Sequence, residues 1–178
     1  NPNSSRLHSY NYHSSNKVVH TTQPTVTNLL KWSEDLSNAV WAKSGAGTAV
    51  VGGELAPDGT LTGYKLTVPA APGGLYQFAT GAVLSGDTDT QAIWLKGDIE
   101  GTINIATSDG SQHKSCAVTT SWQRFSVTYT APSNNAGMYI KKASAADLST
   151  VYVWHPQLEN VTNQSIQTMG VYVPTTDH

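Results

Sequence analysis

Short segments in which hydrophobic and polar residues alternate recur along most of the chain. From 102 to 107 the hydrophobic positions are Ile103 and Ile105, and from 123 to 129 they are Phe125, Val127 and Tyr129. Because successive side chains of a strand point to opposite faces of a sheet, each pattern predicts a strand with one buried face. Similar patterns predict further strands at 47–54, 62–68, 75–84, 91–96, 114–119, 137–142 and 150–155.

The same alternation predicts which polar and aromatic side chains face outward. Tyr139 and Lys141 alternate with inward Met138 and Ile140 in their strand, and Asn104 and Arg124 lie opposite the apolar sets of theirs. In the segment 150–155, the valines fall on one face and the aromatic residues on the other. These outward residues are candidates for contacts with a ligand.

Residues that favour turns separate the predicted strands. They form clusters rich in Pro, Gly, Asp and Asn at 56–59, 72–74, 85–87, 108–110 and 132–135. Closely spaced strands without amphipathic helices between them favour an all-β fold of two antiparallel sheets packed face to face, a β-sandwich. The opening of this region, 28–45, has a mixed period that predicts a strand followed by a helical turn.

The chain divides into two parts by composition. Residues 1–27 are polar with no sustained period, which predicts an irregular N-terminal arm, a linker or stalk that follows an upstream domain. Residues 28–178 form the predicted sandwich. The chain begins at Asn1 without an initiator methionine, and we expect it to be the C-terminal fragment of a longer protein.

Charge and cysteine content narrow the class of protein. Charged residues make up 12% of the chain and the net charge is -2, so the sequence lacks the basic character of nucleic-acid-binding proteins. We find neither an apolar run long enough for a membrane span nor a signal peptide. Cys116 is the single cysteine, which excludes an internal disulfide, and its position in a predicted strand indicates a buried thiol.

The sequence contains little that points to catalysis. It has no Gly-x-Ser-x-Gly string, and its six histidines lack the spacing of a zinc site. Acidic residues fall mostly in predicted turns, although the pair Asp98 and Glu100 leaves open a glycoside hydrolase or lyase. Asp87 and Asp89 are weak candidates for calcium ligands, without an EF-hand pattern, and we expect no other cofactor.

Aromatic residues are the most informative class. The chain has five tryptophans and eight tyrosines against two phenylalanines, a bias toward rings that carry a polar group. Such rings suit a surface on which the apolar face of a sugar stacks while neighbouring polar side chains bind its hydroxyls. The alternative is that the tryptophans pack within the protein and bind no sugar, because β-sandwich cores commonly bury tryptophan.

Several strings in sequence order resemble a known family. They are Asn28-Leu29-Leu30 with the segment 33–41, Ala56-Pro57-Asp58-Gly59-Thr60, Trp94-Leu95-Lys96, the segment 122–128 and the segment 151–159. Together, over about residues 28–174, they resemble the carbohydrate-binding-module-like β-sandwich of bacteriophage tailspikes and tail fibres. The usual small pair before Gln157-Leu158-Glu159 is replaced here by His155-Pro156.

The resemblance implies a jelly-roll-like, non-catalytic domain of a phage tail protein, usually a homotrimer, that binds bacterial surface polysaccharide in host attachment. We therefore expect a virion location and depolymerase activity, if any, in the upstream domain. One alternative is a structural cap that stabilises the trimer without binding sugar. The candidate carbohydrate-binding residues are Trp32, Tyr64, Tyr76, Trp94, Asn104, Arg124, Tyr139, Lys141, Trp154 and His155.

Overall fold

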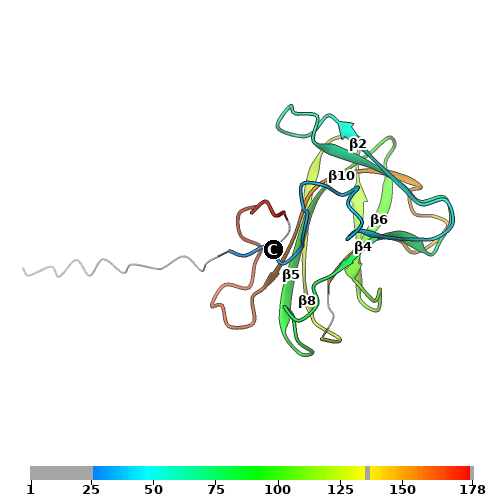
Figure 1. The fold of residues 1–178 in the computed structure, drawn as a ribbon. Coiled ribbons are helices and arrows are strands. Elements are labelled where there is room, and N and C mark those ends of the chain that lie inside the picture. The colour runs from blue at the N-terminus through cyan, green and yellow to red at the C-terminus, as the bar shows by residue number, and fades with distance from the viewer. Residues whose placement is uncertain (1–25, 135–136, 177–178) are drawn as a thin grey trace, which may run out of the picture.

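Ten antiparallel strands form two five-stranded sheets in the computed structural model, which describes residues 26–134 and 137–176 (Figure 1). The first sheet has the order β1-β4-β9-β6-β7, with bounds Ala42–Ser44, Gly73–Phe78, Gly137–Lys142, Gly101–Thr107 and His113–Val118. The second has the order β2-β3-β10-β5-β8, with bounds Ala49–Glu54, Gly63–Thr67, Thr150–Asn160, Thr88–Gly97 and Gln123–Thr130. The predicted all-β sandwich is confirmed.

The hydrophobic core lies between the sheets. Ile103, Ile105, Met138 and Ile140 contribute from the first sheet and are fully buried, as the alternation predicts. Trp41, which precedes β1, is also buried and packs into this core. Each of these side chains removes apolar surface from water, which stabilises the fold by roughly 1.5–3 kcal/mol per side chain.

Two predicted elements are wrong in detail. Residues 28–41 consist of turns and bends, and the strand β1 comes after them, so the order expected for the opening is reversed. The strand predicted at 75–84 ends at Phe78, because Ala82 donates to the carbonyl of Ala79 in a turn. Most of the predicted arm at 1–27 lies outside the described residues, and no helix among those described could span a membrane.

The two ends of the described chain lie side by side (Figure 1). The Leu29 amide donates to the Leu158 carbonyl, and the Thr175 hydroxyl donates to the Leu30 carbonyl at 2.6 Å. Ser33 and Thr175 also exchange backbone and side-chain hydrogen bonds. These contacts hold the C-terminal segment, residues 161–176, against the sandwich.

Cys116 provides a test of core packing. Its side chain is buried, and desolvation raises the pKa of its thiol to about 11. Because the thiolate is the reactive form, we expect Ellman's reagent to label the native protein very slowly and the urea-unfolded protein rapidly. Rapid labelling of the native protein would show that the sandwich opens around β7.

Candidate functional site

Eight of the ten predicted site residues separate onto two opposite surfaces. Outer face A is the solvent side of the first sheet, and outer face B is that of the second sheet. Face A receives Tyr76, Asn104, Tyr139 and Lys141, and face B receives Trp94, Arg124, Trp154 and His155. Trp32 and Tyr64 belong to neither face.

Strand register aligns the residues of face A in two rows that cross the sheet. One row consists of Ala42, Tyr76, Tyr139, Ala106 and His113. The adjacent row consists of Ser44, Gly74, Lys141, Asn104 and Ser115. The centre of face A is covered, because Ala106, Asn104 and Tyr139 are all buried, whereas Tyr76 is half-buried.

Three aromatic rings form a continuous strip on face A. The ring of Tyr76 lies 5.4 Å from that of Tyr139 and 5.4 Å from that of Phe78, both in edge-on contacts. Phe78 is 48% exposed, whereas Tyr139 is 8% exposed and shares a 2.5 Å hydrogen bond with the Ser44 hydroxyl. The free ring surface is therefore that of Tyr76 and Phe78.

Phe78 is a candidate that the sequence reasoning missed. It lies two residues after Tyr76 in β4, so the period of two puts both side chains on the same outward face. Phe78 was passed over because the candidates were chosen among rings that carry a polar group, which phenylalanine lacks.

Polar groups lie beside this aromatic strip. The ammonium of Lys141 donates to the Gly110 carbonyl at 3.1 Å and lies 5.8 Å from the centre of the Tyr139 ring. Asn104 donates to the Lys141 carbonyl at 3.3 Å and to Asp147 at 3.1 Å, and it is almost fully buried. Lys141 thus keeps N–H donors for a ligand, while Asn104 mainly supports the sheet.

The C-terminal segment crosses part of face B. Arg124 donates to the Gly170 carbonyl at 3.1 Å, and the hydroxyl of Thr128 donates to the Gln167 carbonyl at 3.3 Å. Ala92 and Thr90 lie on the same side of β5 as Trp94 and are fully buried. Arg124 is therefore engaged within the chain.

The remaining aromatic residues of face B also bind one another. Trp154 is 8% exposed, donates to the Thr62 hydroxyl at 2.9 Å and lies edge-on to Trp94 at 6.2 Å. Nearby, the Lys96 ammonium lies over Tyr152 at 4.5 Å and over Trp122 at 5.5 Å. These contacts fit the alternative in which Trp94, Trp122 and Trp154 serve packing within the β-sandwich.

His155 occupies an irregularity of β10 between Trp154 and Gln157. Its φ of 51° is unusual for a non-glycine residue, and its ring stacks between Trp154 at 3.3 Å and Tyr172 at 3.7 Å. Desolvation lowers the pKa of His155, although Glu34, 3.2 Å from its Nε2, opposes that shift. His155 thus fastens Tyr172 of the C-terminal segment to face B.

Two further predicted sugar contacts, Tyr64 and Trp32, remain predictions, and their surroundings differ from those of face A. Tyr64 packs against the core from β3, and its hydroxyl donates to the Glu34 carbonyl at 3.2 Å. Trp32 has a φ of 50°, and its carbonyl accepts a 3.0 Å hydrogen bond from the indole of Trp41.

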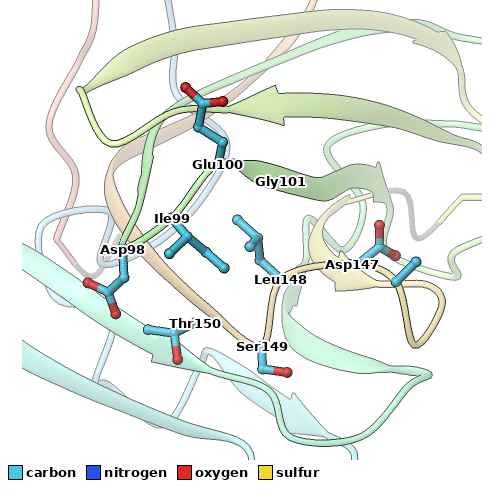
Figure 2. A pocket seen from close by; sticks show the side chains of 9 residues that line it. Asp98, Ile99, Glu100, Gly101, Asp147, Leu148, Ser149 and Thr150 are labelled. Atoms are coloured by element: carbon cyan, nitrogen blue, oxygen red, sulfur yellow. The ribbon is translucent and has the colours of Figure 1, made fainter.

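A cavity of about 460 Å³ contains the carboxylates of the hydrolase alternative (Figure 2). Figure 2 shows the carboxylate of Glu100 pointing away from that of Asp98, with Ile99 and Leu148 beside them. Asp98 accepts a 2.7 Å hydrogen bond from Tyr152, which raises the pKa of that tyrosine to about 12. A glycosidase needs two carboxyls that converge on one bond, and this arrangement lacks that convergence.

The weak calcium prediction gains no support from the geometry. Asp87 accepts a 2.9 Å hydrogen bond from the Leu84 amide in a turn, whereas the side chain of Asp89 is fully buried. Within residues 26–134 and 137–176, no three His, Cys, Asp or Glu side chains form a group that could hold a metal ion. We therefore do not carry the calcium site further.

Comparisons with known proteins report similarity at the level of fold. No protein-family model matches the chain, and no curated protein matches it. The xylan-binding CBM22-1 domain of Paenibacillus barcinonensis Xyn10C superposes with a TM-score of 0.60 at 16% identity, covering 77% of this chain and 96% of that one. The C-terminal family 22 carbohydrate-binding module of Clostridium thermocellum Xyn10B gives a TM-score of 0.56 at 17% identity, over 78% and 96% of the two chains.

A phage protein has a similar fold over part of its length. The enzymatically active domain of bacteriophage CBA120 tailspike protein 4 gives a TM-score of 0.52 at 13% identity, covering 75% of this chain and 21% of that one. The class that the fold defines is thus the carbohydrate-binding-module-like β-sandwich. At these identities the likeness concerns the fold alone.

Proposed function

We propose that this chain is a non-catalytic glycan-binding module that holds a polysaccharide against face A. The observation that carries the proposal is the aromatic strip of Phe78, Tyr76 and Tyr139, with the Lys141 ammonium 5.8 Å from the Tyr139 ring at its inner end. An exposed ring removes the apolar face of a sugar from water, and a nearby N–H donor binds its hydroxyls. The similarity in fold to a xylan-binding domain supports the same function.

We further propose that the polysaccharide belongs to a bacterial surface and that the module serves host attachment in a phage tailspike or tail fibre. The family resemblance of residues 28–174 and the similar fold within a phage tailspike support this context. In a homotrimer, three weak sites on one particle would gain affinity through avidity. The linker at 1–27 would then join the module to the upstream domain.

Removal of the Tyr76 ring tests the proposal. We expect Tyr76→Ala to weaken binding to the recognised polysaccharide at least about tenfold, because the main stacking surface is lost. Calorimetry with a panel of bacterial surface polysaccharides and xylan measures the affinity. Chromatography of the polysaccharide after long incubation detects any cleavage.

Tyr152→Ala is the matched control, because it removes a half-buried tyrosine from face B. Loss of binding with Tyr152→Ala and not with Tyr76→Ala would place the site on face B instead. A panel without any bound glycan would contradict the proposed function and favour the structural cap. Release of shorter oligosaccharides would favour the enzyme.

A further inference from the structure

A second cavity lies at one end of the aromatic strip. It has a volume of about 330 Å³ and is lined by Leu29, Lys31, Phe78, Ala79, Thr80 and Ala82. Phe78 belongs both to the strip and to the wall of this cavity. A glycan that stacks on Tyr76 and continues past Phe78 would therefore enter it.

Hydrogen bonds fix the wall of the cavity before any ligand arrives. The buried Gln77 side chain accepts a hydrogen bond from the Lys31 amide at 2.6 Å and donates to the Lys31 carbonyl at 2.9 Å. The Leu29 amide is held by the Leu158 carbonyl at 2.8 Å. Because the residues on both sides of the cavity are held in place, little conformational entropy would be lost on binding.

The cavity has a mixed chemical character. Leu29, Ala79 and Ala82 contribute methyl groups, while Thr80 contributes an O–H donor. An acetyl group offers the complementary pair, a methyl group and a carbonyl oxygen that accepts hydrogen bonds. The volume falls at the lower end of the range for small-ligand sites, about 300–1,000 Å³.

We infer that this cavity is an additional subsite of the glycan-binding face and that it recognises an O-acetylated sugar residue. The inference rests on the proposed function, because Tyr76 and Phe78 deliver the glycan to the cavity. It adds a chemical class to that function: the ligand carries acetyl esters on some of its sugars. De-esterified chains bind the ring strip alone and therefore bind less tightly.

O-acetylated xylan and the same polymer after mild alkaline de-esterification form a matched pair of neutral probes. We expect the full chain to bind the acetylated form about five- to tenfold more tightly, measured by affinity electrophoresis at several polymer concentrations. Ala82→Phe fills the cavity from an exposed turn position. We expect it to abolish the preference and to leave the affinity for the de-esterified polymer unchanged.

Thr80→Val is the second variant, because it removes one donor at nearly constant volume. We expect it to reduce the preference at least twofold with an unchanged melting temperature. Equal affinity of the wild type for the two polymers, failure of both to bind, or a preference that persists in Ala82→Phe would overturn the inference. The proposed function fails separately, when no polysaccharide of the panel binds or Tyr76→Ala leaves binding intact.

Discussion

Gly74→Ala is expected to destabilise the protein by about 3–5 kcal/mol, a large part of the stability of a typical domain. Gly74 lies in β4 beneath the Tyr139 ring and has a φ of 149°, which side chains rarely adopt. A Cβ at this position would lie 1.9 Å from the Ile140 carbonyl oxygen and 2.8 Å from the Tyr139 ring. Backbone strain and the steric clash therefore both lower the free energy of unfolding, and urea unfolding measures the total loss.

Gly53→Ala is the matched control for this substitution. Gly53 also has a positive φ, 89°, but a Cβ there would meet nothing within 4 Å. We expect it to cost about 1–2 kcal/mol, from the backbone conformation alone. Equal losses for the two variants would contradict the close packing of Tyr139 against β4 and, with it, the described geometry of face A.

Asp89→Asn is expected to stabilise the protein by up to about 3 kcal/mol above pH 6 and to change it little near pH 4. The Asp89 carboxylate is fully buried, and neither of its oxygens has a hydrogen-bond partner in the part of the chain that the structure describes. Desolvation raises its pKa from 3.8 to about 6. The amide keeps the shape of the side chain and removes the buried charge.

The sign of this pH dependence follows from proton binding. Between pH 4 and 6 the folded protein binds more protons at Asp89 than the unfolded chain does, so stability falls as the pH rises through this window. Asp89→Asn should flatten that part of the profile, measured by urea unfolding at pH 4, 5, 6 and 8. A variant less stable than the wild type at pH 8 would show that the carboxylate has a stabilising partner.

Asp87→Asn is expected to change the stability of the protein in the opposite direction. The backbone amide of Leu84 donates to its carboxylate and lowers its pKa. Because the folded state favours the charged form there, stability rises with pH through the range in which Asp87 ionises. We therefore expect Asp87→Asn to lower stability slightly at neutral pH, whereas Asp89→Asn raises it.

The sequence by itself determined most of the strands and the direction of most of their side chains. Alternation identified Ile103 and Ile105 as core residues and Tyr139 and Lys141 as outward ones, because a strand's side chains have a strict period of two. It did not reveal the inward side of Tyr64, which faces the core from β3. The period also fails where a bulge intervenes, as at His155.

The tertiary structure alone decided which sheet each strand joins and which parts of the outer faces stay exposed. Tyr76 and Tyr139 become neighbours through pairing of β4 with β9, two strands separated by 58 residues in the chain. Arg124 and Trp154 are outward in their strands, yet the C-terminal segment and its Tyr172 contact their face. The C-terminal segment is held on face B by hydrogen bonds between residues far apart in the chain, such as Ser33 and Thr175. The local alternation of hydrophobic and polar residues cannot predict such bonds.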